Sequence, residues 1–200
     1  MSTYEEIRGE LKTCDILLFS GKGAISHGIK LFTFSKWSHV GMVLRMPDSK
    51  AVFLWESTRV SNLKDAIDGK KKKGVQLVLL RDRISEYDGA ISIRKINGFN
   101  VSKEQYLKLM AFREEVRNRP YEKNEIELIK SAYDGPLGHN DEDLSSLFCS
   151  ELVAEAYQRI GLLPGSKPSN EYTPKDFSQE KEIEFFGGIS LSDEIIIKVQ

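Results

Sequence analysis

The side chains best suited to nucleophilic chemistry in this 200-residue sequence are its two cysteines, with three histidines as candidate bases. Cys149 opens a stretch in which Leu152, Val153, Ala156 and Ile160 recur at helical spacing on its own face. The first turn of a helix presents unpaired N–H groups and the positive end of the helix dipole, which stabilise a thiolate, the nucleophilic form of cysteine. Cys149 is therefore the candidate nucleophile; a small buried core residue is the plainer interpretation of the same pattern.

The two ends of this helix are marked in the sequence. Ser145 and Ser146 are candidate N-caps, and Gly161 followed by Pro164 ends the helix. The polar residues of 151–159 fall on the side opposite the apolar stripe. The cysteine is thus expected in the first turn, facing the same way as the stripe.

His39 is the histidine most suited to act as a base. It opens an expected strand over 38–44, and Gly41 follows it on the same face without a side chain, which leaves space beside the imidazole. A satisfied histidine at a strand end is the alternative interpretation. The spacings of His27, His39 and His139 to one another and to the cysteines match no zinc pattern, so we expect no metal or other cofactor.

The hairpin after His39 supplies an acid that can orient the ring. A four-residue loop over 46–49 sets a register that places Glu56 directly opposite His39. A slip of one residue would bring a neighbour of Glu56 there instead. A carboxylate beside the ring fixes the imidazole tautomer and stabilises its cation. With Cys149, these residues form the Cys–His–acid arrangement of nucleophilic acyl transfer.

Four stretches in this order also carry a family resemblance: Asp15–Phe19, Trp37–Val43 with its Ser-His-Val-Gly motif, Glu56, and Phe148–Val153 with its Phe-Cys-Ser-Glu-Leu motif. They resemble the circularly permuted papain-like family, in its YiiX-like, NlpC-type branch of amidases. Lecithin:retinol acyltransferase is a more distant relative of this branch. The resemblance spans about residues 13–160 and implies an antiparallel sheet packed on the cysteine helix.

The resemblance also implies roles for individual residues. It makes Cys149 the nucleophile, His39 the base and Glu56 the third polar residue, and it matches Tyr121 to a tyrosine that may line the substrate site or pack as an ordinary core or loop aromatic. Cys14 departs from the family, which usually has glycine before the aspartate.

Together these features predict a cysteine hydrolase or acyltransferase that cleaves an amide or ester bond of a lipid or peptide-like substrate through a thioester. Because the cysteine shares a face with the apolar stripe, we expect an apolar acyl group. A module of the same fold that binds a lipid or acyl group without turning it over is the alternative.

The pattern of apolar residues predicts one α+β domain over residues 1–200 with a mainly antiparallel sheet. We expect strands and helices in the following segments. The strands are 15–19, 38–44, 51–57, 75–80, 90–94 and 194–199. The helices beyond the cysteine helix are a short one over 3–11, which opens on a capping box, and 24–34, 62–67, 102–117 and 124–132.

Composition limits the partners. A net charge of −1 gives no general attraction to nucleic acid, and we expect none as a partner. The one basic cluster is the lysine loop, Lys70, Lys71, Lys72 and Lys73, which is either a solvated loop or a peripheral contact with an anionic membrane. The N-terminus lacks the basic and apolar regions of a signal peptide, and no apolar run approaches ~18 residues, so we expect a cytoplasmic protein.

Overall fold

A six-stranded antiparallel sheet forms the centre of the fold in the computed structural model, which describes residues 3–120 and 148–198. Its strand order is β4-β3-β2-β1-β5-β8, and a separate two-stranded ribbon pairs β6 with β7. The strands are β1 (Ile16–Gly21), β2 (His39–Arg45), β3 (Val52–Thr58), β4 (Gly74–Leu79), β5 (Gly89–Arg94), β6 (Ile96–Asn97), β7 (Ser190–Leu191) and β8 (Ile195–Lys198).

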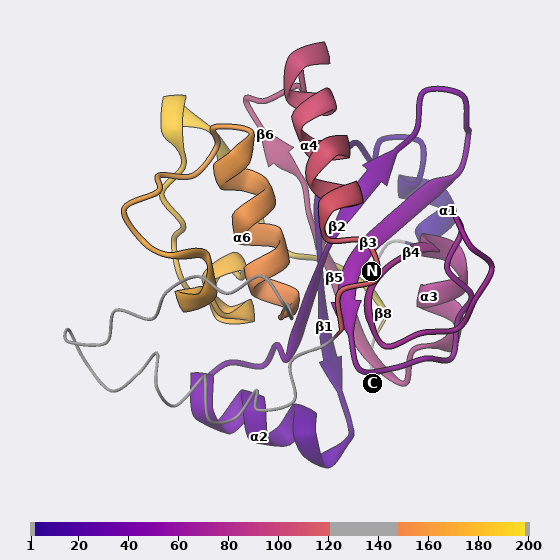
Figure 1. The fold of residues 1–200 in the computed structure, drawn as a ribbon. Coiled ribbons are helices and arrows are strands. Elements are labelled where there is room, and N and C mark those ends of the chain that lie inside the picture. Colours follow the sequence, from indigo (N-terminus) through magenta and orange to yellow (C-terminus); the bar gives the residue numbers. More distant parts are fainter. Residues whose placement is uncertain (1–2, 121–147, 199–200) are drawn as a thin grey trace.

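Helices cover both faces of the sheet and one of its ends. In Figure 1, α6 and α4 lie on one side of the sheet, α1 and α3 on the other, and α2 lies below it. The helices are α1 (Tyr4–Ile7), α2 (Ala24–Thr33), α3 (Leu80–Glu86), α4 (Lys103–Glu115) and α6 (Cys149–Arg159), with short 3-10 turns at Ser169–Glu171, Pro174–Phe177 and Phe186–Gly188.

The predicted fold class is confirmed: the structure is α+β, with an antiparallel sheet packed against the cysteine helix. Every predicted strand is present, and α4 begins at the predicted cap, where the Ser102 hydroxyl accepts a hydrogen bond from the Gln105 N–H at 3.2 Å. The helix predicted over 62–67 is wrong, because that stretch forms turns around the Asp65 carboxylate. The helix predicted over 124–132 lies outside the described residues.

Two apolar layers hold the sheet between its helices. Side chains alternate along each strand, so Met42 and Trp55 face α6 while Val43 and Leu54 face the side of α3. These side chains are fully buried, and each one contributes about 1.5–3 kcal/mol relative to exposure. Burial on both faces explains why these strands read as apolar runs in the sequence.

The β2–β3 hairpin has a different register from the predicted one. Met42 lies opposite Trp55 and Val43 opposite Leu54, so the connection spans 46–51 rather than 46–49. Continuing this register places Glu56 opposite Gly41 rather than opposite His39. The shift is two residues, and an even shift keeps every side chain on its predicted face.

The cysteine helix begins at Cys149, with Phe148 as its N-cap. The predicted caps Ser145 and Ser146 lie outside the described residues and are not the N-cap. The Glu151 carboxylate accepts from the Phe148 N–H at 3.1 Å instead. Glu151 and Glu155 are buried, which corrects the prediction of a polar side: α6 is enclosed on all sides over its first nine residues, Cys149–Tyr157.

Cys14 occupies a backbone position that favours glycine. Its φ angle is +77°, and its side chain is completely buried. The carbonyl of Cys14 accepts from the Tyr157 hydroxyl of α6 at 2.7 Å, and its N–H donates to Val43 O at 3.1 Å. The departure from the family pattern therefore lies at a strained turn that joins β1, β2 and α6.

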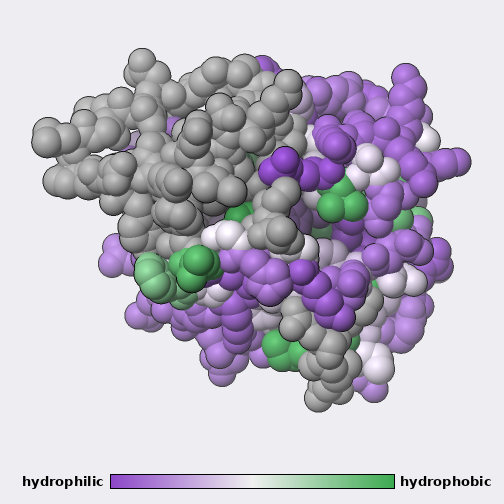
Figure 2. Space-filling view, turned by 90° about the horizontal axis from the view of Figure 1, so that it is seen from below, coloured by the Kyte–Doolittle hydropathy of each residue, from purple (hydrophilic) through white to green (hydrophobic). Residues whose placement is uncertain are grey.

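The face that carries α2 is mainly hydrophilic, with small separate hydrophobic patches (Figure 2). Leu31 of α2 and the adjacent Phe34 are about three-quarters exposed, at 74% and 75%. None of the helices in the two described ranges is long and apolar enough to cross a membrane.

Candidate active site

Cys149 and His39 meet at one end of the sheet. Each is the first residue of its element, α6 for the cysteine and β2 for the histidine. The chain enters α6 at the end of the sheet where β2 begins, close to α2 (Figure 1). The thiol and the imidazole interact through charge and a hydrogen bond, so the structure brings the predicted nucleophile and base together.

The His39 ring is held between an acid and an aromatic side chain. Its Nε2 lies 2.7 Å from Glu56 Oε2, and its ring centroid lies 5.2 Å from that of Phe19. The bond through Nε2 leaves Nδ1 as the nitrogen available to the thiol. Burial works to lower the pKa of His39, but Cys149 and Glu56 outweigh it and raise that pKa to about 10.

Glu56 is a completely buried carboxylate with four donors around it. Oε2 faces His39, whereas Oε1 accepts from Gln76 Nε2 at 2.9 Å, from Arg83 Nε at 2.9 Å and from Arg83 Nη2. Burial works to raise the pKa of Glu56, but the Arg83 charge and the hydrogen bonds of His39 and Gln76 lower it to about 2. The group is therefore an anion at neutral pH.

The missing side chain of Gly41 is what allows this packing. A Cβ added there would lie 2.8 Å from Leu54 Cδ1 and 3.3 Å from Glu56 Cβ. The predicted space next to His39 is thus real, and the strand of Glu56 fills it. This packing also explains why Glu56 contacts His39 although the predicted register was wrong by two residues.

Arg83 and Gln76 belong to the site but were missed in the sequence. Gln76 lies directly opposite Glu56 on β4, and Arg83 lies on α3, for which no helix was predicted. α3 has no side-chain N-cap, so the usual start signal is absent. A lone arginine in a polar stretch is normally solvent-exposed, so composition gave no sign that this one is buried.

A pocket of about 170 Å³ opens beside His39. Tyr87 lines the pocket, and its hydroxyl forms a hydrogen bond with Ser38. Burial raises the pKa of this hydroxyl, and the charges of Glu56 and Cys149 contribute to raising it. The other lining residues combine hydroxyl, apolar and charged side chains: Ser26, Ile29, Ser38, Glu56, Thr58, Arg59, Val60 and Arg83.

The apolar stripe of α6 does not line this pocket. Leu152, Val153 and Ala156 have no exposed surface because they pack against the sheet and its neighbouring helix. The reason given for an apolar acyl group was therefore wrong, since the stripe cannot receive a substrate. The described pocket is mixed in character.

The start of α6 offers main-chain donors beside the sulfur. The first hydrogen bond of the helix runs from the Leu152 N–H to Phe148 O at 3.0 Å. The N–H groups of Cys149 and Ser150 precede it and are not used by the helix. Such groups can donate to an oxygen that becomes negative during acyl transfer.

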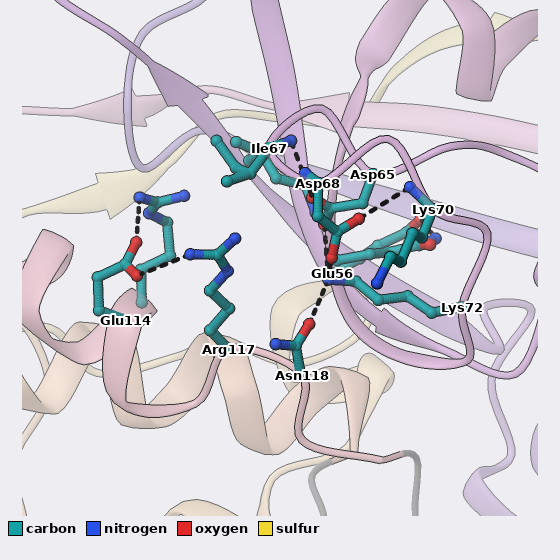
Figure 3. A network of polar contacts seen from close by, with 12 residues as sticks. Glu56, Asp65, Ile67, Asp68, Lys70, Lys72, Glu114, Arg117 and Asn118 are labelled. Carbon is teal, nitrogen blue, oxygen red and sulfur yellow. Dashed lines mark hydrogen bonds and ion pairs between the residues drawn. The ribbon is translucent and has the colours of Figure 1, made fainter.

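Two further predictions concern Tyr121 and the lysine loop. Tyr121 lies outside the described residues. In the lysine loop, Lys72 Nζ reaches Asp65 at 3.1 Å, Asp68 at 3.2 Å and Asn118 at 2.8 Å, a network visible in Figure 3. The side chains of Lys70, Lys71 and Lys73 are exposed. Lys72 therefore holds the loop to the end of α4, and the other three lysines face outward.

These features define the class of fold: an antiparallel sheet with a cysteine helix against it, in which the histidine strand precedes the cysteine in the chain, as in permuted papain-like proteins. Among solved structures, the crystal structure of the metalloprotein YiiX from Escherichia coli O157:H7 is similar, with a TM-score of 0.51 and 23% identity. The match covers 74% of this chain and 66% of that chain, slightly less than two thirds. It shows a shared fold. No protein-family model and no curated protein matches the sequence.

YiiX is described as a metalloprotein. Within residues 3–120 and 148–198, no three His, Cys, Asp or Glu side chains gather so that they could hold a metal ion. Both oxygens of Glu56 already accept hydrogen bonds, one from His39 and the other from Gln76 and Arg83. The described residues do not fit a metal site.

Proposed function

We propose that the protein is a cysteine hydrolase or acyltransferase that cleaves an amide or ester bond through a thioester on Cys149. One observation carries the proposal: a thiol at a helix start interacts with an imidazole whose second nitrogen lies 2.7 Å from a buried carboxylate. A nucleophile, a base and a group that orients the base are the components that nucleophilic acyl transfer requires.

The first half-reaction forms the thioester. His39 holds the thiol proton, so the Cys149 thiolate attacks the substrate carbonyl carbon to form a C–S bond. The carbonyl electron pair moves to oxygen, where the N–H groups of Cys149 and Ser150 are in position to donate. When the oxyanion collapses, the C–N or C–O bond breaks and the leaving amine or alcohol takes the proton from His39.

The second half-reaction restores the enzyme. Water, or an alcohol or amine acceptor, gives a proton to His39 as its oxygen or nitrogen bonds to the thioester carbon. The C–S bond breaks, and the sulfur leaves as a thiolate that stays paired with the protonated imidazole. Water as acceptor makes the protein a hydrolase, and another acceptor makes it a transferase.

Glu56 supports both halves through charge and geometry. It stays ionised because its pKa is about 2, so it favours the protonated form of His39 whenever the sulfur is a thiolate. Its bond to Nε2 also keeps Nδ1 directed at the thiol. A carboxylate in this position is an orienting group and takes no part in bond formation.

For the substrate, we infer a lipid or peptide-like amide or ester, of which one part lies in the pocket beside His39. That pocket mixes hydroxyl groups with the apolar surface of Ile29 and Val60, and Arg59 lies at its lining. A membrane-borne substrate is compatible with the lysine loop, since three of its lysines face outward.

Reactivity of the two cysteines tests the proposal without knowledge of the substrate. Iodoacetamide near pH 7 should alkylate Cys149 much faster than Cys14. Both side chains are buried, at 2% and 0% exposed, so the difference rests on charge: Cys149 lies at a helix start beside His39, whereas burial raises the pKa of the Cys14 thiol. Peptide mapping by mass spectrometry measures the two rates in one sample. Equal rates in the folded protein would contradict the catalytic role of Cys149.

Incubation with a panel of lipid and peptide-like acyl donors then tests the chemistry. The expected result is a mass increase equal to the acyl group on the Cys149 peptide, absent in Cys149→Ala and retained in Cys14→Ala. Cys149→Ser should turn over far more slowly, because serine needs stronger activation than a thiol. Binding of a donor with neither adduct nor turnover would favour a module that binds acyl groups without cleaving them.

A further inference from the structure

Arg83 is almost entirely buried, and its charge is directed at the acid of the candidate site. Its side chain is 3% exposed, and both Nε and Nη2 donate to Oε1 of Glu56. Nη1 donates to the Asn62 side chain at 3.2 Å, which fixes the plane of the guanidinium. The forked donors of arginine suit this kind of fixed pairing, whereas a lysine would offer a single mobile charge.

The two carboxylate oxygens of Glu56 have different hydrogen-bond partners. Arg83 and Gln76 both bond Oε1, and Oε2 is left for His39. The carboxylate therefore cannot rotate away from the ring without breaking bonds to α3 and β4. The position of His39 is thus linked to α3 through Glu56.

We propose that Arg83 is a positioning residue for the Cys149–His39 pair, holding Glu56 ionised and aimed at Nε2 so that the pair stays charged in mildly acidic solution. This proposal rests on the proposed function. It concerns a residue that lines the pocket beside His39 and donates to Glu56, and that acts on the thiol through Glu56 and His39.

The charged and titratable groups around Glu56 and His39 come from every neighbouring element. Glu56 faces His39 of β2, Arg83 of α3 and, more distantly, Tyr87; His39 faces Cys149 of α6. Tyr87 is neutral at neutral pH because burial raises its pKa. Arg83 is the cation bonded directly to the carboxylate, and a second cation, Arg59, lines the same pocket. Removal of Arg83 leaves burial of the carboxylate opposed mainly by the imidazole.

The test is the pH dependence of Cys149 alkylation by iodoacetamide in the full chain, measured from pH 4 to pH 9. In the unmodified protein, alkylation should remain fast into the acidic range. The acidic limb of this pH profile is the range in which the alkylation rate falls as the pH is lowered. In Arg83→Gln, we expect this limb to move to higher pH by about 1–3 units, since an adjacent opposite charge lowers a carboxyl pKa by that amount. At a fixed pH on that limb, each unit corresponds to a tenfold slower reaction.

Arg94→Gln is the matched control. Arg94 is also a buried arginine, but it donates to the carbonyls of Phe177 at 2.9 Å and Ser192 at 2.7 Å, far along the chain from the site elements. This variant should be destabilised without a shift of the acidic limb. If the limbs of Arg83→Gln and Arg94→Gln coincide, Arg83 is a structural residue only and the proposal is overturned.

Two further outcomes keep the inference separate from the proposed function. If Cys149 of the unmodified protein reacts as an ordinary thiol, with no reactivity below neutral pH, the proposed function itself fails. If Arg83→Gln does not fold, Arg83→Met compared with Arg94→Met gives the same test, because methionine removes the charge and keeps a long unbranched side chain. A shift in the same direction supports the proposal, and no shift overturns it.

Discussion

Replacing Glu56 with glutamine should cost far more stability than the loss of one hydrogen bond. The change removes a negative charge that is completely buried and leaves Arg83, 3% exposed, without its counter-ion. Breaking one partner out of a buried ion pair costs about 3–5 kcal/mol, because the remaining charge stays out of water. We therefore expect Glu56→Gln to lower the free energy of unfolding by about 3–5 kcal/mol.

Urea unfolding followed by circular dichroism measures this cost, with the slope of the transition checked for two-state behaviour. The double variant Glu56→Gln/Arg83→Gln removes both charges and should recover part of the loss, with a coupling of about 1–3 kcal/mol. Glu10→Gln is the control for the substitution itself, because Glu10 is paired with Lys95 at an exposed site, and it should leave unfolding nearly unchanged.

Two results would refute this reasoning. A loss below about 1 kcal/mol for Glu56→Gln is the size seen for an exposed pair, and it would mean that the Glu56–Arg83 pair is hydrated in solution. Strictly additive losses in the double variant would mean that the two side chains do not interact. Cys149 alkylation in Glu56→Gln should also slow, since the neutral amide no longer stabilises the protonated ring of His39.

Gly41→Ala should destabilise the protein by about 1–3 kcal/mol and slow Cys149 alkylation, because the added Cβ would lie 2.8 Å from Leu54 Cδ1. Gly9→Ala is the control: no atom lies within 4 Å of its added Cβ, so it should change neither the stability nor the alkylation rate. The pKa of Glu56 lies below its unfolded value, so its contribution to stability is present above about pH 4.5 and is lost as the pH falls toward about 2. The free energies of unfolding from urea titrations at pH 5 and pH 2.5 should differ by roughly 1.4 kcal/mol for each pKa unit of the shift, and equal free energies would contradict the prediction. Alanine at the three exposed lysines of the lysine loop should weaken binding to anionic vesicles by about 1 kcal/mol per lysine and should not change binding to neutral vesicles. Co-sedimentation measures both, and unchanged binding to anionic vesicles would exclude the loop as a membrane contact.

The sequence alone determined the elements that carry the chemistry. Helical spacing after Cys149 placed the thiol at a helix start, and the alternation around His39 placed the imidazole on a strand; both patterns are local and report which face of an element is buried. Glu56 was predicted beside His39 because residues two apart on a strand share a face. A register error of two residues therefore left Glu56 on the face that His39 occupies. The resemblance to permuted papain-like proteins agreed with the observed fold.

Only the tertiary structure decided how Glu56 is held and where the pocket beside His39 lies. In the sequence, Arg83 resembles an ordinary surface arginine. Its burial results from the packing of α3 on β3 and β4, and no local sequence pattern indicates this packing. The apolar stripe of α6 likewise gave no indication whether it faced a substrate or the core, because periodicity identifies a buried face without identifying what covers it. The charge balance around Glu56 arises from residues distant in the chain, 20 positions away for Gln76 and 27 for Arg83, and such contacts exist only once the sheet and its helices have packed together.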